Sequence, residues 1–159
     1  MVELAPVVPP LEVVLVAPQI PPNTGNVART CAVTGCRLHL VGPLGFSLED
    51  KEVRRAGLDY WEGVDLEVHA DWPAFEARHV RGRTGRLHLF TAREGDGLFG
   101  RRFTPGDLLV FGQEQLGLPP ALLAAWPERR VAIPMRPGQR SLNLAVAVGV
   151  GVYAALASL

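Results

Sequence analysis

Three short stretches of glycine, proline and small polar residues stand close behind apolar runs in this chain. They are residues 23–29 (NTGNVAR), residues 111–119 (FGQEQLGLP) and residues 133–144, which begin with IPM and end with RSLNL. Each marks a point where a strand gives way to a loop or a helix. Ligands of α/β proteins bind at that edge of the sheet. The three stretches therefore predict a binding site formed by loops that are distant in sequence.

The rest of the chain alternates apolar runs with helical segments. Expected strands cover residues 12–17, 37–41, 64–69, 86–91, 107–111 and 130–133, and expected helices cover residues 23–34, 47–56, 72–79, 120–126 and 141–159. This alternation predicts an α/β fold, a mostly parallel sheet with helices on both faces. The length suits a single domain over residues 1–159, of which proline-rich residues 1–11 are expected to form an extended lead-in.

The formal net charge is zero, but the charges are unevenly distributed. Acids crowd residues 49–76, whereas residues 77–140 hold eleven arginines against five acids, a net charge of about +6. Arginine matches phosphate geometry bidentately. For any one arginine a solvated surface is the better interpretation. For the segment as a whole, an RNA-facing surface is an equal alternative.

Cysteine and histidine provide no evidence for a metal site. Cys31 and Cys36 are too few for a disulfide framework and match no metal pattern without further ligands, so buried thiols are expected. With no secretory signal, a reducing cytoplasm is the expected location. His39 and His88 lie in strand patterns and are expected to be core or edge residues. No metal is therefore predicted.

The C-terminal segment is apolar on nearly every side. Residues 142–159 have the length of a membrane span, but they end a well-patterned soluble chain and contain Asn143. A helix that is apolar all round is otherwise buried on all sides. In so small a domain this requires a second subunit. The segment predicts a homodimer through the C-terminal helix rather than a membrane anchor.

Two polar residues flank the start of the first expected helix. Asn23 or Thr24 can cap this helix, and Arg29 lies in its second turn. Apolar neighbours suggest that the stem of Arg29 is partly buried, which requires an anionic or carbonyl partner such as an RNA phosphate or Glu114. The plainer alternative is a capping asparagine and a surface arginine.

The other two stretches also carry polar side chains. Glu114 is the only acid between Phe111 and Trp126, and a plain turn with an exposed glutamate is equally compatible with the pattern. Ser141 can cap the last helix, while Asn143, expected one turn inside it, needs a hydrogen-bond partner. A serine cap and a satisfied asparagine would explain both residues without chemistry.

In this order and at these spacings, the three stretches resemble the motifs of the SPOUT RNA methyltransferases. The similarity extends over residues 13–153, and residues 20–26 (IPPNTGN) and 54–60 (RRAGLDY) are further specific pieces. The chain is most similar to the tRNA (cytidine/uridine-34-2′-O)-methyltransferase group, whose members are single catalytic domains. This resemblance implies a C-terminal trefoil knot, a homodimer, S-adenosylmethionine as cofactor and the anticodon stem-loop of tRNA as partner.

The resemblance also implies roles for individual residues. Positions matching catalytic or substrate-contacting residues are Asn23, Arg29, Glu114, Ser141 and Asn143. Positions expected to bind the cofactor are Phe90, Thr91, Gly112, Gly117, Ile133, Met135, Ser141 and Leu142. Arginines expected to contact RNA are Arg54, Arg55, Arg136 and Arg140.

The chain departs from the family pattern at Ala145-Val146 and at Ala154, where small polar residues and glutamate are usual. Both departures fall in the expected dimer helix and concern the interface more than the chemistry. Two alternative functions remain. The enzyme could methylate another 2′-hydroxyl in tRNA or ribosomal RNA, or the chain could bind S-adenosylmethionine or RNA without catalysis.

Overall fold

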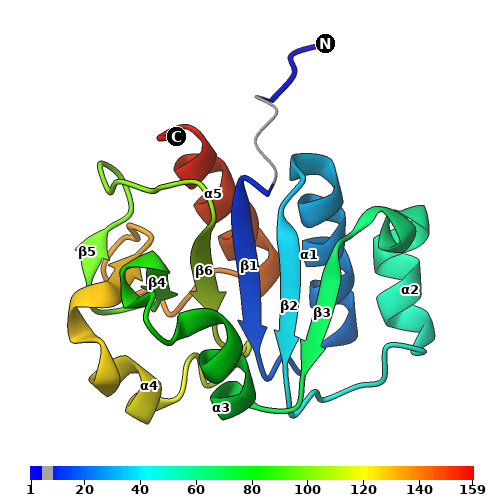
Figure 1. Cartoon of the computed structure of the whole chain (residues 1–159), viewed down its shortest axis with the longest axis horizontal. Coiled ribbons are helices and arrows are strands. Elements are labelled where there is room, and N and C mark those ends of the chain that lie inside the picture. The colour runs from blue at the N-terminus through cyan, green and yellow to red at the C-terminus, as the bar shows by residue number, and fades with distance from the viewer. Residues whose placement is uncertain (5–8) are drawn as a thin grey trace.

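A computed structural model gives the structure of residues 1–4 and 9–159, apart from the side chains of residues 57–60. A seven-stranded sheet forms its centre, with the strand order β3-β2-β1-β6-β4-β7-β5 and parallel pairing throughout (Figure 1). The strands are β1 (Leu11–Val16), β2 (Arg37–Val41), β3 (Leu66–His69), β4 (Leu87–Phe90), β5 (Asp96–Gly97), β6 (Asp107–Phe111) and β7 (Arg130–Ala132). The predicted parallel sheet is confirmed.

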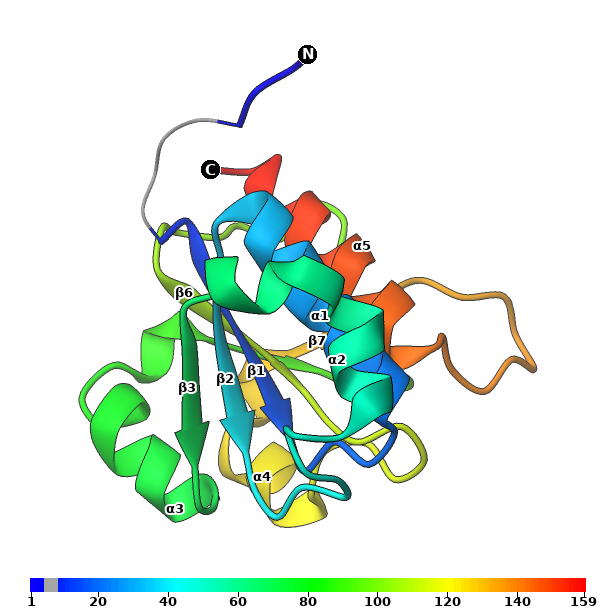
Figure 2. The same ribbon diagram turned by 90° about the vertical axis from the view of Figure 1, so that its right-hand side faces the viewer.

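Helices cover both faces of this sheet, as predicted (Figure 2). One face carries α1 (Pro21–Thr34), α2 (Lys51–Gly57) and α5 (Leu144–Leu156), and the other carries α3 (Trp72–Phe75), the π-helix η2 (Glu76–Val80) and α4 (Pro120–Ala125). Short 3-10 turns complete the chain: η1 (Leu58–Gly63), η3 (Thr84–Arg86) and η4 (Pro127–Arg129). The fold is therefore a three-layer α/β sandwich.

The central strand β1 shows how the two cores form. All six of its residues are buried, which is typical of a parallel strand covered on both faces. Leu11, Val13 and Leu15 belong to the core beneath α1 and α5. Val14 and Val16 belong to the core beneath α3, η2 and α4. The alternation follows from successive side chains pointing to opposite faces of the sheet.

The helices expected over residues 47–56 and 72–79 differ from the prediction in their boundaries. The helix expected over residues 47–56 begins only at Lys51, because the Asp50 carboxylate accepts a hydrogen bond from Glu52 N at 2.8 Å and so caps the later start. The helix expected over residues 72–79 divides into α3 and η2. Helix boundaries are the least reliable part of a sequence-based prediction, since a single cap decides them.

Strand β5 has no counterpart in the prediction. Its two residues, Asp96 and Gly97, carry no apolar alternation, yet they pair with β7 at the edge of the sheet. The buried Leu98 anchors the segment, and its backbone amide donates to Ala132 O at 2.9 Å. Burial of one leucine and backbone pairing hold this edge in place, and neither has a periodic signature in sequence.

The lead-in expected over residues 1–11 is described in part. Residues 1–4 are exposed and have no regular secondary structure, β1 already begins at Leu11, and residues 5–8 lie outside the description. Across the described part of the chain, none of the helices combines the length and apolar character needed to cross a bilayer.

The two cysteines are buried thiols, as predicted. Cys31 and Cys36 are free and buried, and burial raises the pKa of both thiols, so they stay protonated and unreactive at neutral pH. His39 and His88 lie in β2 and β4 and are buried, as expected of core residues.

Helix α5 is buried along one stripe only. Its buried residues are Leu144, Val148, Gly151, Val152 and Ala155, and the helix packs against α1, β1 and β6. On its other side Val146 and Tyr153 are 51% and 50% exposed. A single chain therefore does not cover this apolar helix on all sides.

Candidate active site

The carboxyl ends of β4, β6 and β7 open into a cavity of about 870 Å³. The loops that follow these strands line it, together with the start of α5. All eight residues expected to bind the cofactor lie in its wall: Phe90, Thr91, Gly112, Gly117, Ile133, Met135, Ser141 and Leu142. The volume is that of a typical small-molecule site. The structure thus brings together loops that are separated by up to fifty residues in sequence.

Glycine is required where the loop after β6 folds against itself. A Cβ atom on Gly112 would lie 2.0 Å from Gly117 C and 2.1 Å from Leu118 N, which no real side chain tolerates. Gly117 has a φ of 69°, and its amide donates to Gln113 O at 3.0 Å. Both glycines therefore follow from the tight turn that forms this wall of the cavity.

The cavity also contains charged side chains that the sequence did not single out. Arg93 and Glu94 line it from the loop after β4, beside Arg140 and Glu114 from the other loops. Glu94 forms an ion pair with Arg130. In the sequence, only one feature pointed to Arg93 and Glu94: they follow shortly after Phe90-Thr91, at the end of an expected strand.

Glu114 reaches across to the chain segment that precedes α1. Its carboxylate accepts hydrogen bonds from Gln19 N and Ile20 N, both at 3.0 Å, and from Asn23 Nδ2 at 3.5 Å. The partners on residues 19 and 20 are backbone amides, which no side-chain pattern reveals. Glu114 thus links the loop after β6 to the start of α1.

The predicted cap of α1 is wrong. The helix begins at Pro21, with Ile20 at the N-cap position and no side-chain cap, rather than at Asn23 or Thr24. Pro21 and Pro22 lack amide hydrogens, so the first turn has fewer donors to satisfy. The side chain of Asn23 is therefore not needed as a cap and can form hydrogen bonds with other elements. Asn23 is buried in the first turn of the helix.

The predicted cap of α5 is wrong as well. The helix begins at Leu144, and Asn143 is its N-cap, with Oδ1 accepting from Val146 N at 3.2 Å. Asn143 is therefore not one turn inside the helix. Its Nδ2 donates to Asn23 Oδ1 at 3.0 Å, which supplies the expected hydrogen-bond partner. Ser141 is exposed and lines the cavity instead of capping the helix.

These contacts form a chain from Glu114 through Asn23 to Asn143, which joins the loop after β6 to the starts of α1 and α5. Four of the five residues expected at catalytic positions thus belong to one region, by hydrogen bonds or by lining the cavity. Arg29 lies six residues after Asn23 on α1, and the residue as a whole is exposed.

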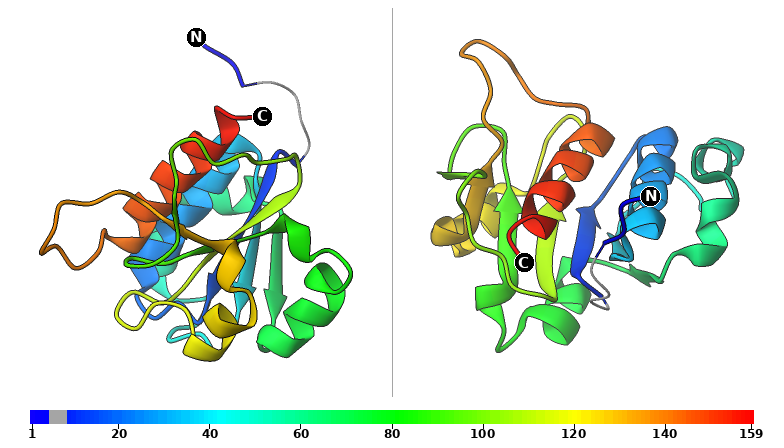
Figure 3. Two further views of the ribbon diagram at one scale, coloured as in Figure 1. Left: turned by 90° about the vertical axis from the view of Figure 1, so that its left-hand side faces the viewer. Right: turned by 90° about the horizontal axis from the view of Figure 1, so that it is seen from above.

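The four arginines expected to contact RNA are all exposed. Arg54 and Arg55 end α2, and Arg54 pairs with Glu49 at 3.3 Å. Arg136 and Arg140 lie on the loop between β7 and α5, which extends away from the body of the molecule (Figure 3). The structure places these two pairs on different elements.

Part of the positive surplus of residues 77–140 is neutralised within the chain. Arg86 pairs with Glu12, which lies outside this segment, whereas the pair of Arg130 with Glu94 is already contained in the net count. Arg101 contacts His88 Nδ1 through Nε at 2.8 Å. These arginines hold strands and loops together, so the overall count overstates the positive charge available to RNA.

The double role of Asn143 gives a first prediction. Asn143→Ala removes the cap, and we expect the free energy of unfolding to fall by about 1 kcal/mol. Asn143→Asp retains an oxygen for Val146 N but loses the donor to Asn23 Oδ1. We expect it to keep more stability than the alanine variant. Denaturant unfolding at one fixed protein concentration measures both.

Ser141→Ala is the matched control for that experiment. Ser141 is exposed and makes no capping bond in the described structure, so its removal should change stability by less than about 0.5 kcal/mol. A larger loss in Ser141→Ala than in Asn143→Ala would contradict the assignment of Asn143 as the cap.

Comparison with known proteins identifies the family and several relatives of this chain. The model of the SpoU rRNA methylase family matches residues 10–153. The tRNA (cytidine(34)-2′-O)-methyltransferase of Burkholderia pseudomallei is 55% identical over 144 residues, covering 90% of this chain and 92% of that protein. A solved structure concerning 2-OH methylation of C/U34 on tRNA is 50% identical, with a TM-score of 0.84 over 90% of this chain and 91% of that one.

A more distant solved structure shares the fold and was determined with a cofactor. The SpoU methyltransferase AviRb from Streptomyces viridochromogenes, in complex with the cofactor AdoMet, is 26% identical with a TM-score of 0.79, covering 96% of this chain and 59% of that chain. The strand order, the loops that surround the cavity and the match over residues 10–153 lead to one assignment. The chain belongs to the SpoU rRNA methylase family.

Proposed function

We propose that this protein transfers a methyl group from S-adenosylmethionine to the ribose 2′-oxygen of nucleotide 34, the wobble nucleotide, in tRNA. The observation that carries this proposal is the cavity at the ends of β4, β6 and β7, which gathers residues from the stretches 111–119 and 133–144 and from the loop after β4, while residues 23–29 do not line it. The 55% identity to a tRNA (cytidine(34)-2′-O)-methyltransferase supports the substrate. The name of that relative specifies both the acceptor atom and the nucleotide.

The residues of the cavity fit S-adenosylmethionine. Gly112 and Gly117 keep the loop after β6 free of side chains, so that backbone groups can approach a ligand closely. Phe90, Ile133 and Leu142 give apolar walls. The lining also carries charges of both signs, as suits a ligand with a sulfonium and a carboxylate: acidic Glu94 and Glu114, and basic Arg93 and Arg140. When bound, the cofactor supplies a methyl group on a sulfonium, which is already an excellent leaving group.

The remaining tasks fall to the polar chain that begins at Glu114. Catalysis requires the 2′-oxygen to lie in line with the methyl group and to lose its proton. The hydrogen bonds that Asn23 donates to Glu114 and accepts from Asn143 tie the start of α1 to the loop after β6 and to the start of α5. In this assignment Ser141 and Asn143 hold either the substrate ribose or the loop on which they lie. Glu114 positions α1 and, with it, Arg29.

Arg29 is assigned to the substrate oxygen rather than to proton removal. An arginine with a pKa above about 12 is a poor base at neutral pH. Its guanidinium can polarise the 2′-oxygen or orient the neighbouring phosphate, which can itself accept the proton. The exposure of Arg29 on α1 is compatible with contact to an incoming RNA.

A homodimer through α5 completes the proposed enzyme. Exposed apolar side chains on α5 (Val146, Tyr153) and on the neighbouring α1 (Val33) offer a surface that one chain leaves uncovered. Family membership also supports a C-terminal trefoil knot. A tRNA substrate implies the cytoplasm, and the free thiols of Cys31 and Cys36 agree with a reducing compartment.

The proposed RNA surface comprises Arg54, Arg55, Arg136 and Arg140, and it predicts salt-dependent binding. Arg136→Ala should weaken tRNA binding and reduce the slope of log affinity against log salt by about one, as expected for one lost phosphate contact. Arg81→Ala, which removes another exposed arginine with no assigned role, is the control. Filter binding across a salt series measures both, and equal slopes for the two variants would remove Arg136 from the RNA surface.

The choice of acceptor atom can be tested with one change in the RNA. An anticodon stem-loop with a 2′-deoxyribose at nucleotide 34 lacks only the proposed acceptor oxygen. We expect the ribose form to accept a labelled methyl group and the deoxyribose form to accept none. Equal labelling of both RNAs would place the methyl group on another atom.

A further inference from the structure

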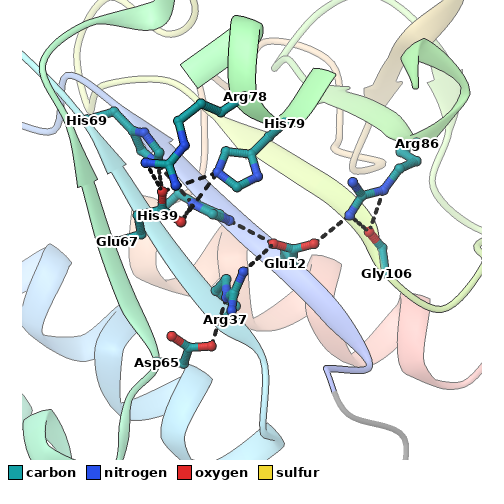
Figure 4. Close-up of polar contacts among 10 residues, drawn as sticks. All are labelled: Glu12, Arg37, His39, Asp65, Glu67, His69, Arg78, His79, Arg86 and Gly106. Carbon is teal, nitrogen blue, oxygen red and sulfur yellow. Dashed lines mark hydrogen bonds and ion pairs between the residues drawn. The ribbon is translucent and has the colours of Figure 1, made fainter. Parts of the chain in front are cut away.

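Four side chains that can bind a metal meet on the face of the sheet opposite α1. They are His39 on β2, Glu67 and His69 on β3, and His79 on η2 (Figure 4). One ligand atom from each lies within 4.8 Å of all the others. None of the four lines the cavity of the candidate active site.

Strand pairing creates this cluster, which explains why the sequence did not reveal it. The parallel register places His39 directly opposite Glu67, and His69 follows two residues later on the same face of β3. His79 is brought over them by η2. Forty residues separate the first ligand from the last, and the spacing matches no compact metal motif.

The distances approach those of a tetrahedral site. His39 Nδ1 lies 3.1 Å from His69 Nε2 and 3.8 Å from Glu67 Oε2. Glu67 Oε1 lies 3.8 Å from His69 Nε2, and the Glu67 carboxylate lies 3.3 Å from His79 Nε2. A tetrahedral zinc ion with bonds of about 2.0–2.1 Å separates its ligand atoms by roughly 3.3 Å. Small side-chain rotations would therefore complete the site.

A carboxylate outside the cluster orients one of the ligands. His39 Nε2 lies 2.8 Å from Glu12 Oε1, and Arg86 pairs with the other oxygen of Glu12. When Nε2 carries the proton and donates it to Glu12, the lone pair of Nδ1 faces the centre of the cluster. Carboxylate, histidine and metal in this order are the usual arrangement around protein-bound zinc.

Two of the four ligands are enclosed by the protein. The side chains of His39 and His69 are 0% and 2% exposed. An ion held between them would be shielded from water, so its ligands would come from the protein.

A metal ion would replace two hydrogen bonds within the cluster. His39 Nδ1 and His69 Nε2 face each other at 3.1 Å and can share one proton. His79 Nε2 lies 3.3 Å from Glu67 Oε1, also within hydrogen-bond distance. Arg78 contacts Glu67 Oε1 at 2.9 Å, but its side chain is 69% exposed and can leave that oxygen without loss of packing.

We propose that His39, Glu67, His69 and His79 bind a zinc ion that fastens η2 to β2 and β3. Three imidazoles and one carboxylate in a tetrahedral arrangement favour Zn²⁺ among the common divalent ions. Four protein ligands leave no open position for substrate, so the ion is structural rather than catalytic. Glu67, together with the outer carboxylate Glu12, balances its charge.

The test uses untagged full-length protein, dialysed against chelator and then titrated with Zn²⁺ in a calorimeter. We expect one ion per chain and a higher midpoint of thermal unfolding with the ion present. Titration with Co²⁺ should give the intense visible absorption bands of four-coordinate cobalt. Absence of stoichiometric zinc binding, or the weak spectrum of six-coordinate cobalt, would overturn the proposal.

Variants separate ligands from bystanders. His79→Gln removes a ligand. Glu12→Gln removes the charge of the orienting carboxylate, and with it the ion pair with Arg86, and should weaken zinc binding by about 10- to 100-fold. We expect the loss in His79→Gln to be at least as large. Arg78→Ala is the control beside the cluster and should bind zinc at least as tightly as the unchanged protein. Equal affinity for zinc in His79→Gln and Arg78→Ala would exclude His79 as a ligand.

Misfolding of a variant would not leave the proposal untested, because the cobalt spectrum is recorded on the unchanged chain. Circular dichroism of each metal-free variant identifies those that fold. His39 and His69 are too deeply buried for informative substitution, whereas the side chain of His79 is 14% exposed and that of Glu67 is 23% exposed. Substitutions at these two positions disturb the core least.

Discussion

Gly112→Ala should abolish binding of S-adenosylmethionine while leaving most of the fold intact. The added methyl group would lie 2.0 Å from Gly117 C and 2.1 Å from Leu118 N, both of which are backbone atoms. The loop after β6 must therefore open, and this loop forms one wall of the cavity. We expect the dissociation constant to rise by about 100-fold or more, since several contacts are displaced together.

Isothermal titration with the cofactor measures that change, and circular dichroism confirms that the variant is folded. Gly85→Ala is the matched control, because a Cβ atom there meets nothing within 4 Å and its φ is not in the left-handed region. The control should bind the cofactor normally. Cofactor affinity in Gly112→Ala within about threefold of the unchanged protein would show that the cofactor does not occupy this cavity.

Arg29→Lys should reduce the rate of methyl transfer by about 10²–10³-fold, the usual effect of removing one well-placed donor from a developing oxyanion. Lysine keeps the charge but not the planar fork that can contact the 2′-oxygen and a phosphate together. Arg29 is not in the wall of the cavity, so cofactor affinity should be unchanged. Single-turnover methylation with saturating cofactor and tRNA isolates the chemical step.

Arg81→Lys serves as the control for charge-preserving changes on an exposed arginine and should leave the rate unaltered. Retention of most of the turnover by Arg29→Lys would contradict the assigned role. A loss confined to tRNA affinity, with an unchanged single-turnover rate, would make Arg29 an RNA-binding residue only.

Apolar patterning predicted six of the seven strands and the two helical layers. The run at residues 11–16 is buried on both faces, and a run of this kind admits few other folds. Helix starts were harder, since single contacts decide them. Asn143 rather than Ser141 caps α5, and the carboxylate of Glu114, ninety-four residues away, lies at the N-cap residue of α1.

The cavity was better predicted than the contacts around it. Glycine and proline mark the ends of β6 and β7, and parallel strands bring these ends and that of β4 to one edge. The hydrogen bonds of Glu114 with Gln19 N and Ile20 N involve backbone amides and carry no side-chain signal. The histidine cluster depends on the register of β2 against β3, which periodicity alone does not specify.

Direct mapping of the methylated nucleotide tests the central claim. The purified protein is incubated with labelled S-adenosylmethionine and tRNA that lacks 2′-O-methyl groups, and the labelled nucleotide is identified by mass spectrometry. The proposed reaction gives a 2′-O-methyl group on nucleotide 34 and on no other. A label on another nucleotide would contradict the substrate, and no label with bound cofactor and properly modified tRNA would contradict catalysis itself.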